Sequence, residues 1–182
     1  VASRGLGDVY KRQGFVTSMK FDEPLKIVAV DKIPKAQDAP LDNLMQLFRL
    51  CTKMERICDD NEGIGLSAVQ IGIPWKLFIV KRNRQFEYYV NCDYEGFGDK
   101  IKSVEGCLSL RNEEGSFRRF EVERFAKVKI KGKQLIVSGM PSLVLHDVAK
   151  EEINLFSIVF QHEIDHGKDV LISQIGREIE LS

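Results

Sequence analysis

Apolar residues recur at helical spacing in the first third of the chain. The repeating positions are Leu41, Leu44, Met45, Phe48, Cys51 and Cys58. Intervals of three, four and seven residues are typical of one face of an α-helix. The pattern therefore predicts an amphipathic helix over residues 38–59, with the two cysteines as thiols on its buried face.

Segments rich in aromatic and β-branched residues follow, and they predict strands. WKLFIVK (75–81) and FEYYVN (86–91), separated by RNRQ, predict a β-hairpin. Four more strands are predicted over residues 27–30, 120–132, 134–139 and 142–149. The second and third of these are expected to be joined by a turn at Gly132-Lys133.

Near the end of the chain the pattern returns to helical spacing. From about Glu151 the apolar positions predict a largely buried helix that ends near Gly167. Strands outnumber helices and are joined by short turns. The predicted fold class is therefore α+β, with antiparallel sheets packed around one central helix that carries the HExxH sequence.

Composition narrows the possible classes of protein without changing this fold. The 182 residues include 27 basic and 27 acidic side chains, so no basic field predicts binding to nucleic acid or to a membrane. No apolar run reaches the roughly 18 residues of a membrane-spanning helix. The four cysteines form no tight framework, which favours reduced thiols and a reducing compartment.

The first 18 residues differ from the rest of the chain. They contain three basic residues, one acidic residue and three glycines, with little apolar pattern. We expect residues 1–18 to be a non-native leader or a disordered tail, and residues 19–182 to form a single catalytic domain.

Two of the three histidines lie four residues apart in QHEIDH, at residues 161–166. On an α-helix, His162 and His166 project side by side, so both can bind one metal ion. Glu163 lies close enough to reach a metal-bound water. This H-E-x-x-H pattern is typical of metal-assisted hydrolysis with the glutamate as general base.

A catalytic metal needs a third protein ligand and one open position. The chain downstream of the histidines offers only Asp169, Glu178 and Glu180, all poorly placed. The third ligand is therefore expected upstream, from His146 or from a cysteine. Cys107, in VEGCLSL, follows a glycine in a stretch expected to be irregular, and a thiolate would complete a Cys-His-His set.

A third candidate segment is GIGLSAVQIG, at residues 63–72. Gln70 carries an uncharged carboxamide that can donate a hydrogen bond to an oxyanion. A capping or solvated glutamine is the alternative interpretation of this residue on its own.

Together, the three segments resemble the peptide deformylase family. The family's first motif, G-φ-G-L-A-A-x-Q, stands here as GIGLSAVQ, with Ser67 in place of alanine. E-G-C-L-S is intact at residues 105–109, and Q-H-E-x-D-H is intact at residues 161–166. The resemblance covers roughly residues 24–172, and the short tail of this chain resembles virus-encoded members.

The resemblance implies a role for each matching residue. Cys107, His162 and His166 would bind one divalent metal ion, with Fe²⁺ as the native ion and Zn²⁺, Ni²⁺ or Co²⁺ able to substitute. Glu163 would take a proton from the metal-bound water and pass it to the leaving amine. Gln70 and the backbone N–H of Leu108 would stabilise the oxyanion. The activity implied is removal of the formyl group from N-formyl-methionyl peptides, with release of formate.

The family's methionine pocket also maps onto this chain. The matching substrate-binding positions are Ile64, Gly65, Leu155, Ile158 and Val159. Ordinary core packing is the alternative for the apolar members of this set. Bacterial relatives carry a long C-terminal helix, whereas the sequence here has only a short tail, so docking to the ribosome through such a helix is not expected. The implied location is the cytoplasm of a bacterium or of a virus-infected bacterial host.

Two other functions remain open at the level of sequence. A general HExxH metallopeptidase would cleave unformylated peptides and would need no role for Cys107. A catalytically silent relative, or a structural metal module, would need a closed site with four ligands.

Overall fold

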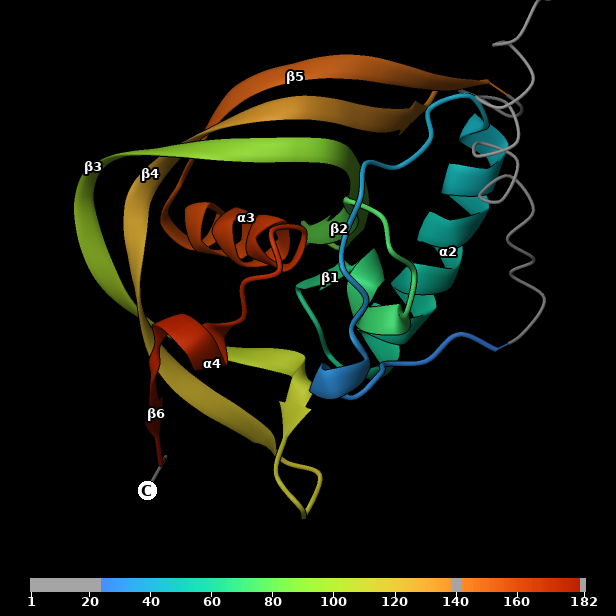
Figure 1. The fold of residues 1–182 in the computed structure, drawn as a ribbon. Helices are drawn as coiled ribbons and strands as arrows, with labels where there is room; N and C mark the ends of the chain where they lie inside the picture. Colours follow the sequence, from blue (N-terminus) through green and yellow to red (C-terminus); the bar gives the residue numbers. More distant parts are fainter. Residues whose placement is uncertain (1–23, 139–141, 181–182) are drawn as a thin grey trace, which may run out of the picture.

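The computed structural model describes residues 24–138 and 142–180, and the expected leader over residues 1–18 lies outside them (Figure 1). The described residues form an α+β fold around an antiparallel sheet with strand order β1-β2-β3-β4-β5, to which β6 adds by pairing with β4. The strands are β1 (Gly65–Ser67), β2 (Leu77–Arg82), β3 (Gln85–Arg111), β4 (Phe117–Val137), β5 (Leu143–Ile153) and β6 (Arg177–Ile179). The helical elements are η1 (Val30–Lys32), α2 (Leu44–Asp60), η2 (Ala68–Ile71), α3 (Asn154–His166) and α4 (Ile172–Ile175).

Strand β2 is buried on both faces because it lies between two helices. Leu77 and Ile79 join a core cluster with α2, whereas Phe78 and Val80 pack with Phe160 of α3. Alternate side chains of a strand point to opposite faces, so one apolar run supplies both clusters. Figure 1 shows α2 and α3 on either side of β1 and β2.

The long strands β3 and β4 curve around α3 (Figure 1). Their pairing shifts register between Val90 and Asp93, between Phe97 and Lys100, and between Gly106 and Arg111. Such irregularities bend a strand and increase its twist. The curvature places the end of β3 beside α3, which has the predicted central position.

The predicted hairpin over residues 75–91 is confirmed. Arg82 pairs with Gln85, and the two residues between them, Asn83 and Arg84, have φ angles of 51° and 65°. Positive φ at both central residues is typical of a type I′ turn, whose twist matches that of the flanking strands.

Both predicted long helices are present, although they begin later than the pattern indicated. Helix α2 begins after Asn43, whose side chain accepts a hydrogen bond of 3.0 Å from the backbone N–H of Gln46 and caps the helix. Cys51 and Cys58 are fully buried on its inner face, as predicted.

The predicted strand over residues 27–30 is wrong. The segment runs irregularly into η1, and the N–H of Val28 donates to the carbonyl of Gln70 at 2.9 Å. Leu25 and Ile27 still pack on the core beside α2. These apolar residues are therefore partly buried by packing on the core, without pairing in the sheet.

The predicted turn at Gly132-Lys133 is also wrong, because β4 runs unbroken from Phe117 to Val137. A Cβ atom at position 132 would lie 2.4 Å from the Cys92 sulfur. Here glycine allows close approach of the neighbouring strand rather than a turn.

The stretch around Cys107 was expected to lie between strands, and that is wrong. It lies within β3, where the register shift begins after Gly106.

In residues 24–138 and 142–180, no helix is both long and apolar enough to cross a bilayer.

Candidate metal centre

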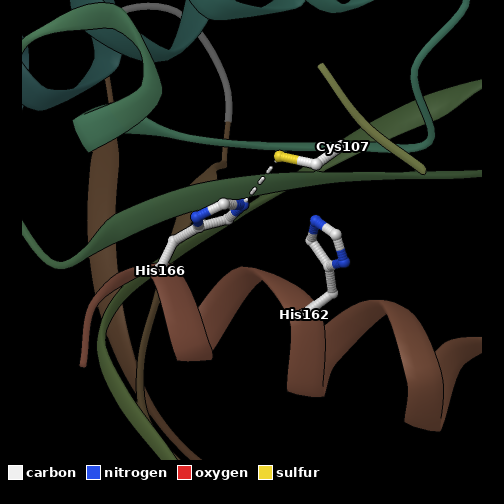
Figure 2. A group of neighbouring side chains, drawn as sticks. All are labelled: Cys107, His162 and His166. Atoms are coloured by element: carbon white, nitrogen blue, oxygen red, sulfur yellow. Dashed lines mark hydrogen bonds between the residues drawn. The ribbon is translucent and has the colours of Figure 1, made fainter. Parts of the chain in front are cut away.

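Cys107, His162 and His166 come together between the end of β3 and helix α3 (Figure 2). One potential ligand atom from each lies within 4.8 Å of the other two. Cys107 is 2% exposed and His166 is also 2% exposed. Three of the residues singled out from sequence thus converge, although 55 positions separate Cys107 from His162.

The spacing of these donors fits a tetrahedral metal ion. Metal–sulfur and metal–nitrogen bonds of about 2.3 and 2.0–2.1 Å give a tetrahedron edge of about 3.5 Å. The Cys107 sulfur lies 3.5 Å from Nε2 of His166. The rings of His162 and His166 have centroids 4.9 Å apart. No fourth His, Cys, Asp or Glu belongs to this group among the described residues, which leaves a position for water or substrate.

The protonation of the two imidazoles also fits a metal site. Burial, together with the charges of His162 and Arg124, holds the pKa of His166 well below its ordinary value, so its ring is neutral. Burial alone would lower the pKa of His162, but hydrogen bonds to Cys107 and Glu105 raise it well above the ordinary value. A cation between these donors would replace that proton.

His162 is oriented by a carboxylate that the sequence did not reveal as functional. Nδ1 of His162 lies 2.9 Å from Oε2 of Glu105, which leaves Nε2 directed at the centre. Partners of this kind fix the ring orientation and raise the basicity of a metal ligand. Nδ1 of His166, in contrast, has no hydrogen-bond partner among the described residues.

Arg124 holds this arrangement together from β4. Its Nε and Nη2 atoms donate to the two oxygens of Glu105 at 2.8 and 2.9 Å, and Nη1 donates to Asp165. Burial alone would raise the pKa of Glu105, but hydrogen bonds from Arg124 and His162 lower it to about 2. Glu105 is therefore an anion beneath His162. Tyr94 extends the network by donating from its hydroxyl to Asp165 at 3.0 Å.

Glu163 lies beside the centre with only 5% of its surface exposed. Burial raises its pKa to about 7, with His162 acting in the opposite direction. A carboxylate with this pKa can exchange protons near neutral pH. A Cβ atom at Gly65 would lie 2.5 Å from Oε1 of Glu163, so the absence of a side chain lets β1 lie directly against the carboxylate.

Gln70 presents its amide nitrogen to the same centre. Its Oε1 atom accepts a hydrogen bond of 2.9 Å from the backbone N–H of Ser67. The Nε2 atom therefore points the other way and donates to the Cys107 sulfur at 3.2 Å. A neutral donor held in this way suits stabilisation of an oxyanion.

A cavity of about 260 Å³ opens in front of these groups, and we call it the front cavity. It is lined by residues that the sequence singled out as catalytic, metal-binding or substrate-binding: Ile64, Gly65, Gln70, Cys107, Leu108, Leu155, Ile158, Val159, His162 and Glu163. Ile64 and Leu155 remain 45% and 51% exposed at its rim, so they are available to an incoming apolar side chain.

Sequence reasoning missed part of this cavity and the supporting role of three residues. The outer part is lined by Asn61, Glu62, Ser103, Val104, Phe117 and Arg119. Glu105 and Asp165 carried a signal, because both lie within the quoted motifs. Arg124 lies in a strand rich in alternating charges and carried none. His146, considered as a ligand, is exposed on β5 and lies outside the metal-ligand group.

The chain is similar to known proteins over most of its length. A family model described as polypeptide deformylase matches residues 25–178. A peptide deformylase of Heliobacterium modesticaldum is 30% identical over 153 residues, which cover 79% of this chain and 92% of the relative.

Solved structures give the same result. The actinonin-bound class I type b peptide deformylase of Acinetobacter baumannii aligns with a TM-score of 0.68 at 25% identity, over 84% of this chain and 96% of that one. A probable peptide deformylase of Synechococcus phage S-SSM7 aligns with a TM-score of 0.65 over 83% of this chain and 99% of that one. At 23% identity, the phage protein supports the fold alone.

Proposed function

Because the chain belongs to the polypeptide deformylase family, we propose that it removes the formyl group from N-formyl-methionyl peptides at a divalent metal ion. The ligands proposed are Cys107, His162 and His166. The observation that carries the proposal is their convergence, within 4.8 Å of one another, at a cavity that also contains Glu163 and Gln70.

The proposed reaction divides the work among four groups. When bound, the divalent ion supplies Lewis acidity, which acidifies water and polarises the formyl carbonyl. Glu163 accepts a proton from the attacking water and later donates it to the amine nitrogen as the C–N bond breaks. Nε2 of Gln70 and the backbone N–H of Leu108 donate hydrogen bonds to the oxygen on which negative charge develops.

The front cavity supplies the proposed preference for methionine. Ile158 and Val159 lie on α3 about one turn before His162, so their side chains are close to the metal ligands. Together with Ile64 and Leu155 they form an apolar wall suited to an unbranched thioether side chain. Gly65 would contact the substrate backbone, where the lack of a side chain permits close approach.

We propose Fe²⁺ as the native ion, because the family resemblance implies it; a mixed thiolate and imidazole set would also accept Zn²⁺, Ni²⁺ or Co²⁺. Metal analysis of protein purified without oxygen identifies the bound ion. A cytoplasmic location stays a prediction.

The experiment that tests the function measures formate released from formyl-Met-Ala-Ser. Wild-type protein is expected to release one formate per free amine formed. Glu163→Ala is expected to keep its metal but to lose about 100- to 10,000-fold in kcat, because the proton acceptor is removed. Cys107→Ala is expected to lose the metal as well, since two imidazoles alone hold it weakly.

Cys51→Ala is the matched control, because Cys51 is a buried thiol in α2 that packs in a different core cluster from Cys107. It is expected to keep both metal and activity. Cleavage of unformylated peptides by the wild type would favour the metallopeptidase alternative. Full activity in Cys107→Ala would rule out the proposed ligand set.

A further inference from the structure

A second cavity, of about 130 Å³, lies at the C-terminal end of α3, and we call it the rear cavity. Its polar walls come from Asp38, Ser67, Lys76, Asn91, Asp93 and Lys168. Among the residues that the structure describes, Glu163 alone lines both the rear cavity and the front cavity. The proposed general base therefore separates two spaces.

Gly167 lines the rear cavity without contributing a side chain. Residues four apart share one face of a helix, and side chains lean toward the helix N-terminus. A side chain at position 167 would therefore extend back toward Glu163. Gly167 has a φ angle of −70°, which any residue can adopt. A Cβ atom there would lie 3.2 Å from the carbonyl oxygen of Ile164 and 3.4 Å from Cγ of Lys76.

The cavity runs from the protein surface to a buried carboxylate. At the surface, Lys76 pairs with Asp38 at 2.9 Å, and the aspartate side chain is 72% exposed. A second pair, between Lys168 and Asp93, has similar exposure. Exposure then falls to 5% at Glu163. The two ion pairs thus lie at the mouth and the carboxylate at the inner end.

Glu163 needs a hydrogen-bond donor that the described residues do not supply. Its Oε2 atom is buried and has no partner among them. A buried carboxylate oxygen without a hydrogen bond is costly. A polar site of about 10–15 Å³ already accommodates one water molecule, so the rear cavity has room for several. Because Glu163 lines both cavities, water in the rear cavity can contact this carboxylate from the Gly167 side while the attacking water contacts it from the front cavity.

We propose that the rear cavity is a solvent passage through which water, and carboxylates as small as formate, reach Glu163 while a peptide fills the front cavity. The inference rests on the proposed function, because it takes Glu163 as the general base. Its consequence is that small polar molecules reach the general base from behind α3 while the peptide occupies the front cavity.

Chemical rescue of Glu163→Ala tests this passage. Added sodium formate can take the place of the missing carboxylate, accepting the proton from the attacking water and returning it to the amine. Amine release from formyl-Met-Ala-Ser is expected to rise about tenfold with formate, a fraction of what a positioned base contributes. Pivalate, which is too bulky for the passage, is expected to have no effect.

Two measurements show whether formate enters through the rear cavity or through the front cavity: the dependence of rescue on peptide concentration, and the effect of a side chain at position 167. Rescue through the rear cavity persists at saturating peptide, whereas rescue through the front cavity declines as peptide occupies it. The double variant Glu163→Ala/Gly167→Leu is expected to lose most of the rescue. Glu163→Ala/Gly167→Ala is the matched control and is expected to lose less of it. No rescue at all, rescue that declines with peptide, or rescue unchanged by Gly167→Leu would each overturn the passage.

A crystallographic comparison tests the passage independently of turnover. In the wild type, ordered water is expected to contact Oε2 of Glu163 from the Gly167 side, and in Gly167→Leu that water is expected to be displaced. A dry cavity in the wild type would refute the inference even if deformylation is confirmed. Water in the cavity of a protein that fails the formate assay would instead place the error in the proposed function.

Discussion

Helix α3 and the end of strand β3 support the same candidate centre in different ways. His162 and His166 are four residues apart on one helix, so local backbone geometry alone sets them side by side. Cys107 lies where β3 loses regular register with β4, and Glu105 lies two residues earlier, opposite Phe120. Their positions depend on contacts with residues far away in the sequence.

The difference shows which contacts the site depends on. The Cys107 side chain packs in a cluster with Phe120 and Val122 of β4 and with Ile172 of α4. Glu105 is held by Arg124, which also binds Asp165 on α3. Arg124 therefore connects the strand half of the site to the helix half, and the strand half is the one that mutation should disturb most easily.

The largest expected effect comes from Arg124→Leu. It leaves Glu105 and Asp165 as buried carboxylates without their cation. Removing one partner of a buried ion pair costs about 3–5 kcal/mol, which corresponds to a fall in Tm of roughly 10 °C or more for a chain of this size. Calorimetry measures the loss. Metal analysis should also show weaker binding, because His162 loses its oriented carboxylate.

Arg124→Lys is the matched control for this prediction. Lysine keeps the positive charge but cannot bind Glu105 through two parallel N–H groups, so an intermediate loss of stability is expected. A Tm for Arg124→Leu within a degree or two of the wild type would show that the two halves of the site are held independently.

The next effect is a loss of stability in acid that originates in the strand half. Because the folded pKa of Glu105, about 2, lies below its ordinary value of 4.5, the unfolded chain binds the proton more readily. The ionised Glu105 therefore contributes to the free energy of unfolding above pH 4.5, and this contribution is lost as pH falls toward 2. A shift of this size corresponds to about 3 kcal/mol. Urea unfolding of metal-stripped protein between pH 6 and pH 3 should follow the first part of this loss.

Glu105→Gln should flatten this part of the pH dependence, because the titrating group is gone. Glu121→Gln provides the comparison, since Glu121 also binds basic residues but lies at the surface of β4. Surface pairs contribute little, so its pH profile should resemble that of the wild type. Equal flattening in both variants would argue against a special role for the buried carboxylate.

The same contrast explains what the sequence could predict. Helical spacing correctly placed the two histidines together, and the hairpin at Asn83-Arg84 followed from local composition. The ten predicted residues that line the front cavity came partly from the chemistry of the motifs and partly from the family resemblance, and they do converge. Local patterns and short motifs thus predicted most of the groups that face the centre.

Interactions between distant segments were not predictable in this way. The contact of Arg124 with Glu105 spans 19 residues, and its contact with Asp165 spans 41 residues. The apolar run at residues 27–30 resembles a strand, yet its Val28 N–H binds Gln70 instead of a sheet. Gly167 lines the rear cavity, and the pattern of residues alone does not show which glycine faces a cavity.

The smallest expected effect concerns Tyr94, and it shows whether the hydrogen bond to Asp165 on α3 helps to position the metal ligands. Tyr94→Phe removes the hydroxyl that donates to Asp165 at 3.0 Å, which should cost about 1 kcal/mol, or roughly 3 °C in Tm. Tyr88→Phe is the matched control, because its hydroxyl donates to Glu55 of α2 at 2.6 Å, away from the centre. Both variants should lose similar stability, but only Tyr94→Phe should weaken metal binding, by a few-fold, through Asp165 and Arg124. Equal metal affinity in the two variants would mean that orientation of His162 depends on Arg124 and Glu105 alone, and that Tyr94 stabilises the fold without positioning the site.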